Sequence, residues 1–227
     1  MGRITLQGNP PIDVLVRQSG RARRLSLRVS RLDGRVTLTL PRGVSLDEGR
    51  RFAESKSDWI AGNVTARPSE VAVGFGSLLP VEGVHHKIVP GAGRVPRLTE
   101  AGLEAPVSGT AGALRAWLVE RARARAMARI GGYSAQIGRK PGRLTLRDTR
   151  SRWGSCTEAG NIMLSWRLIL APSEVFDYVV AHEVAHLAEM NHSPDFWAAV
   201  AAIYPGYAAP RRWLRREGHD LHRYRFD

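Results

Sequence analysis

Two histidines and a glutamate form the pattern in this sequence that points most directly to chemistry. His182, Glu183 and His186 spell H-E-x-x-H within the run EVFDYVVAHEVAHLAEM, which is expected to be a helix starting at Pro172 and Ser173. Four residues advance a helix by about 400°, so the two imidazoles lie about 40° apart on one face and can share a zinc ion. Glu183 lies beside them, within reach of a water molecule at the metal. The pattern predicts metal-dependent hydrolysis with Glu183 as the group that moves the proton.

A third metal ligand is expected nearby, because a catalytic zinc ion takes three protein ligands and keeps one position open. His192 is the best candidate, since Asn191 can end the helix in a left-handed turn and Ser193 with Pro194 can begin the next helix. His192 would then lie at a corner that returns toward the metal. Glu189 is interpreted either as a carboxylate that supports a ligand or as a solvated charge. The weaker rivals for ligation are Asp195, Glu217, His219 and His222.

The stretch SRWGSC supplies further candidates on the substrate side. Residues 153–156 predict a tight loop against the metal cleft, or else a core tryptophan beside a turn glycine, Gly154. Arg150 or Arg152 is a candidate for polarising a substrate carbonyl or gripping a phosphate. Cys156 has no evident histidine partner, so a buried apolar role is expected for it rather than a nucleophilic one.

A long helix and two strands are predicted to position these residues. Residues 110–137 contain no proline and carry an apolar face in the 3.6-residue period. The members of that face are Leu114, Trp117, Leu118, Ala122, Ala126 and Ile130. Residues 143–148 and 161–170 are predicted to be strands, with the irregular stretch SRWGSCTEAG between them. The polar face of the long helix is interpreted as a solvated surface or as a phosphate-binding one; its arginines are Arg115, Arg121, Arg123, Arg125 and Arg129.

The first hundred residues are expected to be rich in strands. Residues 14–41 predict a basic antiparallel ribbon that turns at Asp33 and Gly34, and a helix capped by Ser45 and Glu48 follows over about 45–66. Between residues 67 and 112, Gly and Pro alternate with short apolar runs that predict two or three more strands. The fold class is therefore α+β, with a β-rich lobe over residues 1–108 and a catalytic region over 109–227.

Composition excludes several classes of protein. The chain has 227 residues, of which 43% are hydrophobic and 24% charged, so wholesale disorder is excluded. No apolar run is long enough to span a bilayer and the first residues lack the apolar core of a secretory signal, so a cytoplasmic protein without a membrane segment is expected. The single cysteine cannot form an internal disulfide. The net charge of +13 makes nucleic acid a candidate partner.

The second half of the chain resembles a known family. The motifs that carry the likeness are R-S-R-W-G-S-C at Arg150 to Cys156, I-M-L-S-W-R-L, Y-V-V-A-H-E-V-A-H-L and N-H-S-P-D-F-W. They resemble the YgjP-like metallopeptidase family, which is similar to the zinc-dependent WLM and SprT-like proteases of the zincin class. The resemblance implies a zincin-like core with one zinc ion per chain, ligands at His182, His186 and His192, and a catalytic Glu183. Ser165 stands where family members often carry Asn.

Three functions are compared on this basis. The leading hypothesis is a zinc peptidase in which water activated by Glu183 attacks a peptide carbonyl, on a protein or peptide substrate that is itself held on nucleic acid. One alternative keeps the metal but hydrolyses a nucleotide phosphoanhydride, although no G-x-x-x-x-G-K-[ST] phosphate loop is present. The other alternative is a non-catalytic basic module that binds nucleic acid.

Overall fold

Two large buried cores organise the part of the chain that this computed structural model describes, residues 2–8, 10–30, 33–65 and 69–227. The chain divides into two compact units, Met1–Ser69 and Glu70–Asp227, and each contains one of these cores. Both units combine helices with small sheets, so the α+β class is confirmed. None of the helices formed by the described residues is long and apolar enough to cross a membrane.

In the first unit, a four-stranded sheet in the order β1-β2-β4-β3 shares a core with two helices. The elements are β1 (Gly2–Leu6), β2 (Ile12–Ser19), β3 (Ser26–Val29), β4 (Val36–Pro41), α1 (Leu46–Glu54) and α2 (Ser57–Thr65). Strands β3 and β4 are antiparallel across the predicted turn at Asp33 and Gly34; Arg31 and Leu32 lie outside the described residues. Ser45 caps α1 by accepting a hydrogen bond from the Glu48 amide at 3.2 Å, as its sequence predicted.

Two features of this unit differ from the sequence prediction. The stretch 14–30 forms two strands instead of one, and β2 runs parallel to β4. A turn in which the Ala22 amide donates to the Ser19 carbonyl takes the chain out of the sheet, so β3 returns on the other side of β4. The expected single helix breaks at Ser55, whose hydroxyl donates to the Phe52 carbonyl at 2.8 Å and competes with helix continuation. Ala66, its expected end, lies outside the described residues.

The second unit begins with five short strands, where two or three were expected. They are β5 (Val71–Ala72), β6 (Leu78–Val81), β7 (Val84–Gly91), β8 (Arg97–Thr99) and β9 (Gly102–Pro106), and the last four form a sheet in the order β6-β7-β9-β8. Leu79 and Leu103 of this sheet are buried in the same core as Leu114 and Leu118 of α3 (Thr110–Ile137). Because this core is shared, β6 to β9 belong to the same unit as α3, and the boundary between the two units falls after Ser69 in the chain. The sequence prediction put the boundary between residues 108 and 109.

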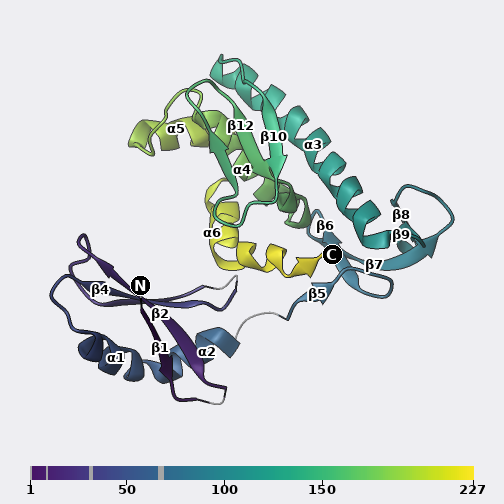
Figure 1. Ribbon diagram of the computed structural model, residues 1–227. Helices are drawn as coiled ribbons and strands as arrows, with labels where there is room; N and C mark the ends of the chain where they lie inside the picture. Colours follow the sequence, from purple (N-terminus) through teal and green to yellow (C-terminus); the bar gives the residue numbers. More distant parts are fainter. Residues whose placement is uncertain (1, 9, 31–32, 66–68) are drawn as a thin grey trace. The chain divides into compact units, whose positions relative to one another are not determined.

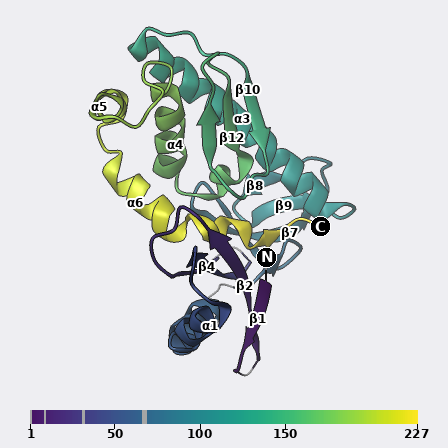
Figure 2. The ribbon, with the colours of Figure 1, turned by 60° about the vertical axis from the view of Figure 1, so that its left-hand side comes forward.

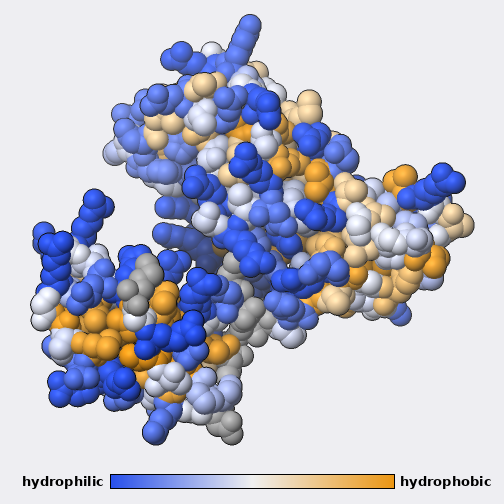
Figure 3. All heavy atoms as spheres, viewed as in Figure 1, coloured by the Kyte–Doolittle hydropathy of each residue, from blue (hydrophilic) through white to orange (hydrophobic). Residues whose placement is uncertain are grey.

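The region of residues 75–107, which contains strands β6 to β9, holds most of the exposed large hydrophobic residues of the second unit. Six of its eight exposed large hydrophobic residues belong to this region: Phe75, Leu78, Val84, Val95, Leu98 and Val107. Orange and pale spheres mark this end at the right of Figure 3. The H-E-x-x-H pattern, on residues 182–186, therefore lies outside this region of the unit.

The rest of the second unit surrounds the H-E-x-x-H helix. Its elements are β10 (Leu144–Arg147), β11 (Gly154–Cys156), β12 (Ile162–Ser165), the 3₁₀ helix η1 (Trp166–Leu170), α4 (Ser173–Ala185), α5 (Pro194–Ile203), α6 (Ala208–Glu217), the 3₁₀ helix η2 (Gly218–His222) and β13 (Tyr224–Arg225). Figures 1 and 2 show the three-stranded sheet, in the order β10-β12-β11, lying against α3 and α4. Strand β13 pairs in parallel with β5, so the last strand closes onto the first strand of the unit. The long helix α3 has the bounds that the sequence predicted.

Arg167 explains why only the first part of residues 161–170 is a strand. It is 8% exposed, and its guanidinium binds the Asp148 carboxylate at 2.6 and 3.1 Å. A further nitrogen donates to the carbonyls of Leu221 and Tyr224. These partners lie far along the chain, and the 3₁₀ turn of η1 holds the side chain inside the unit among them. The same contacts fasten the C-terminal segment to η1 and to the loop that carries Asp148.

Candidate metal centre

Three histidine rings converge at the end of α4. The Nε2 atoms of His182 and His192 are 3.0 Å apart, and one ring nitrogen from each of His182, His186 and His192 lies within 4.8 Å of the others. Helix α4 ends at Ala185 and His186 is its C-cap, so the helix is shorter than the predicted run to Met190. The rivals for ligation named from the sequence are outside this cluster of described residues.

The corner that returns His192 is built differently from the expectation. Asn191 is not left-handed, because Glu82 is the one non-glycine residue with a positive φ among the described residues. Instead, the Asn191 side-chain oxygen accepts a hydrogen bond from the Ser193 amide at 3.0 Å. Ser193 then caps α5 by accepting from the Phe196 amide, as its sequence predicted. Two short polar side chains therefore form the turn that a left-handed residue was expected to make.

The donor set fits a tetrahedral metal ion. In a tetrahedral site, zinc–nitrogen bonds of about 2.1 Å place two ligand nitrogens about 3.4 Å apart. The nitrogen–nitrogen distances in this cluster, 3.0 Å for one pair and up to 4.8 Å for the others, lie on either side of that value. Burial and the neighbouring histidines lower the pKa of His182 to about 3, so its ring stays neutral and keeps a lone pair. The buried Nδ1 atom of His182 has no hydrogen-bond partner among the described residues. His186 bonds through Nδ1 to the Glu189 backbone carbonyl at 2.9 Å, which leaves its Nε2 atom for a metal.

Two aromatic side chains pack against the histidine rings. Phe196 is fully buried, and its ring centroid lies 4.5 to 4.9 Å from those of His182, His186 and His192. Trp197 stands next to it, 5.7 Å from His182 and 6.0 Å from His192. Sequence reasoning assigned no role to either aromatic residue. Their position in the first turn of a predicted helix, just after His192, was the available signal.

Glu183 is packed against β11. It is 5% exposed, and burial raises its pKa to about 8 while the charge of Arg152 opposes the rise. A Cβ atom on Gly154 would lie 2.5 Å from the Glu183 carboxylate oxygen Oε1. Gly154 is not among the positive-φ glycines, so its function is to admit the carboxylate and not to make a special turn.

A cavity of about 460 Å³ opens over the histidines and Glu183. Its other lining residues are Ser151, Arg152, Gly154, Ser155, Cys156 and Met190, so the SRWGSC stretch faces the cleft, part of it as strand β11. Arg150 is not among the lining residues, and its charge acts on His222. Trp153 packs on His222 with ring centroids 5.1 Å apart. Burial, followed by the charge of Glu183, raises the pKa of the Cys156 thiol to about 11, so the thiol is neutral.

The arginines of α3 are largely engaged with carboxylates. Arg125 binds both oxygens of Asp177 at 2.9 Å, and Arg129 binds Asp177 at 2.9 Å as well. Arg121 and Arg125 both reach Glu82 in the β6–β7 turn, at 2.7 and 3.1 Å. The network ties α3, α4 and this turn together. This part of the basic face therefore serves the fold.

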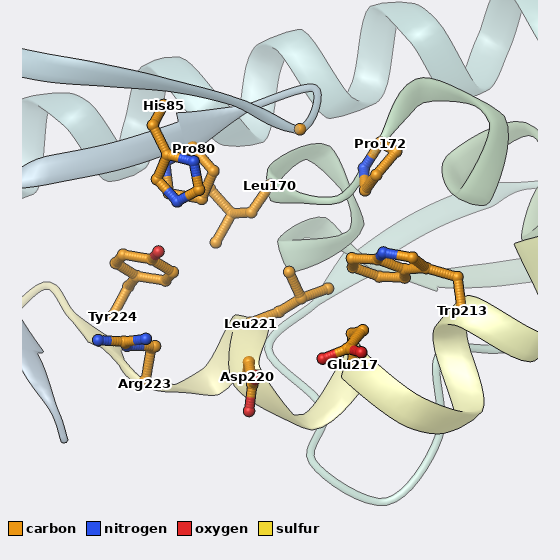
Figure 4. Close-up of a pocket in the computed structure, with 11 residues that line it drawn as sticks. Pro80, His85, Leu170, Pro172, Trp213, Glu217, Asp220, Leu221, Arg223 and Tyr224 are labelled. Atoms are coloured by element: carbon orange, nitrogen blue, oxygen red, sulfur yellow. The ribbon is translucent and has the colours of Figure 1, made fainter. Parts of the chain in front are cut away.

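A separate cavity of about 400 Å³ lies away from the histidines, between the β6–β7 hairpin and the C-terminal segment. Figure 4 shows His85 and Pro172 on one side and Trp213, Leu221 and Tyr224 on the other. Glu217 in this cavity accepts a hydrogen bond from Arg216 at 2.6 Å, and the Oδ1 atom of Asp220 lies 2.9 Å from the Nε2 atom of His219. Glu217, His219 and Asp220 thus belong to this region and not to the metal centre.

Comparison with known proteins gives two matches. Residues 23–217 match the family described as YgjP-like, metallopeptidase domain. Among solved structures, the crystal structure of the metallopeptidase zymogen of Pyrococcus abyssi abylysin is similar, with 23% identity and a TM-score of 0.36 over 41% of this chain and 92% of that chain. No curated protein matches the chain.

Proposed function

This chain belongs to the YgjP-like metallopeptidase family, and we propose that it is a zinc-dependent peptidase with its active centre at His182, Glu183, His186 and His192. The observation that carries the proposal is the convergence of three imidazoles beside a buried carboxylate, all four side chains lining one cavity. Three histidines with an open fourth position are a ligand set of catalytic zinc. Bound there, zinc would supply a Lewis acid and lower the pKa of a coordinated water toward 7.

Glu183 is proposed to transfer the proton from the attacking water to the leaving amine. Its carboxylate is buried beside the histidines, with a pKa near neutrality, which suits a group that both accepts and returns a proton. It takes the proton of the attacking water and passes it to the nitrogen of the leaving amine. Gly154 keeps the carboxylate in this place by leaving room for it. Arg152, on the wall of the cavity, is proposed to polarise the peptide carbonyl.

Strand β11 favours an extended peptide as the substrate. It is an edge strand, paired with β12 on one side, and its other edge has no strand partner among the described residues. Gly154, Ser155 and Cys156 of this strand all line the metal cavity. A peptide that added to this edge would place backbone amides beside Glu183, with register fixed by main-chain hydrogen bonds. We leave nucleic acid out of the proposal, because Arg125 and Arg129 of the basic α3 face already pair with Asp177.

The test combines metal content with hydrolysis. Wild-type protein is expected to hold about one zinc per chain and to cleave peptides, whereas Glu183→Gln keeps the metal and loses turnover by about 10²- to 10⁴-fold. His192→Ala is expected to lose zinc affinity sharply. A panel of nucleoside triphosphates run in parallel tests the rival phosphohydrolase. Unchanged turnover in Glu183→Gln, or release of phosphate without any peptide cleavage, would overturn the proposal.

A further inference from the structure

A second groove adjoins the metal cavity. It has a volume of about 430 Å³, and Ser151, Arg152 and Ser155 line both spaces. Its remaining lining residues are Thr145, Arg147, Thr149, Thr157, Asn161, Ile162 and Met163. The shared residues make the groove an extension of the cleft over Glu183. A molecule bound at the metal centre therefore has this space within reach.

Sheet register accounts for the residues of the groove. Met163 of β12 is the register partner of Thr145 on β10 and of Ser155 on β11, so these three side chains form a row across one face of the sheet. Arg147 lies two residues after Thr145 and points to the same face. Leu164 is buried in the core behind the sheet. The groove is thus the outer face of the small sheet, directly beside its free edge.

Charge distinguishes this groove from its surroundings. Arg147 and Arg152 are exposed lining residues, no carboxylate lines the groove, and neither arginine forms an ion pair within the described part of the chain. Thr149 holds the Arg152 loop by donating its hydroxyl to the Arg152 carbonyl at 2.8 Å. The arginines of the α3 network, in contrast, have carboxylate partners, and the acids of the cavity in Figure 4 lie next to the side chains of Arg216 and His219. Two free guanidinium groups among hydroxyls are suited to an anionic side chain.

We propose that this groove binds an acidic side chain of the peptide substrate and makes the enzyme selective for peptides with Asp or Glu close to the cleaved bond. The inference rests on the proposed peptidase function. Side chains of a strand added to the β11 edge alternate between the two faces of the sheet, so those on the side of Ser155 face the groove. Arg147 is then the residue that determines specificity, and Arg152 contributes from the border of the two spaces.

The test compares peptides that differ in one charge. Zinc-loaded protein is assayed on matched peptides carrying Glu, Gln or Lys at each position around the cleaved bond. The expected kcat/KM for Glu exceeds that for Gln by about tenfold at one or more positions on the groove side. Arg147→Gln should remove this preference and Arg147→Glu should reverse it in favour of Lys. Arg139→Gln removes the same charge from an exposed residue that lines neither space and should leave the preference intact.

Binding to an inactive variant separates the two proposals. In Glu183→Gln, fluorescence anisotropy of labelled Glu and Gln peptides should show the same tenfold difference in Kd, and Arg147→Glu should reverse it. Equal kcat/KM for the Glu and Gln peptides at every position overturns the acidic subsite while the peptidase proposal stands. If no peptide is cleaved, the peptidase proposal fails, and equal Kd values for the two peptides then overturn the subsite independently.

Discussion

Two carboxylates on helix α4 are almost equally buried and yet have opposite surroundings. Asp177 is 6% exposed and binds two arginines, Arg125 and Arg129, from α3. Glu183 is 5% exposed and forms no hydrogen bond or ion pair within the described part of the chain. A buried charge with partners stabilises the packing of helices, whereas a buried charge without them costs stability and remains available for chemistry. The comparison agrees with the roles proposed for the two residues, Asp177 in the fold and Glu183 in the reaction.

The largest effect is expected from making the same change at both positions. Asp177→Asn should lower the free energy of unfolding of metal-free protein by about 2 to 3 kcal/mol, because the neutral amide ends the charged hydrogen bonds of buried Asp177 with half-buried Arg125 and exposed Arg129. Glu183→Gln should not lower it, because burial already raises the pKa of Glu183 and the neutral amide removes the cost of a buried charge. Urea denaturation of the two variants measures both values. A similar loss of unfolding free energy in both variants would contradict the contrast drawn between Asp177 and Glu183.

A smaller effect is expected from crowding Glu183 without altering it. Gly154→Ala puts a methyl group about 2.5 Å from the carboxylate oxygen, so Glu183 must move and kcat should fall about tenfold to hundredfold. Zinc content should be retained, because the three histidines are untouched. Gly131→Ala is the matched control, since nothing lies within 4 Å of the added atom and the residue is inside α3. Full activity in Gly154→Ala would show that the position of Glu183 is not critical.

The smallest effect concerns His222, a titratable side chain that packs on Trp153 and is not part of the histidine cluster. Burial, followed by the charge of Arg167, lowers the pKa of His222 from 6.5 to about 4. The unfolded chain therefore binds a proton that the folded chain does not, and stability falls as the pH decreases from about 6.5 to 4. After allowance for solvent screening, His222 contributes about 1 kcal/mol to this loss. His222→Gln should show a shallower decrease than wild type in metal-free denaturation curves; parallel curves would assign the acid sensitivity to other groups.

The parts of the site that sequence alone predicted are those that depend on neighbours in the chain. Spacing along one helix is enough to bring His182 and His186 to one face, and local caps are enough to start α5 after His192. The long helix α3 follows from its apolar period. These features depend on interactions within a few residues, which periodicity and capping patterns record directly.

The parts that sequence did not predict depend on distant partners. Arg167 meets Asp148 and the carbonyls of Leu221 and Tyr224, and these contacts turn a predicted strand into η1. The contact between Gly154 and Glu183 also joins residues far apart in sequence, so the sequence left open whether residues 153–156 form a loop against the cleft or a core turn. Likewise, an arginine-rich helix face looks the same in sequence whether its charges meet water or, as for Arg125, a buried carboxylate.

The pairing of β5 with β13 has a mechanical consequence. The two strands are parallel and join the first and last elements of the second unit, through Val71 with Tyr224 and Ala72 with Arg225. In a parallel pair, the segment that enters β5 and the segment that leaves β13 extend from opposite ends of the ladder. Tension between these two segments therefore loads the hydrogen bonds together, in shear, instead of opening them one after another. The ladder shields the histidine cluster from a pull on either end of the unit.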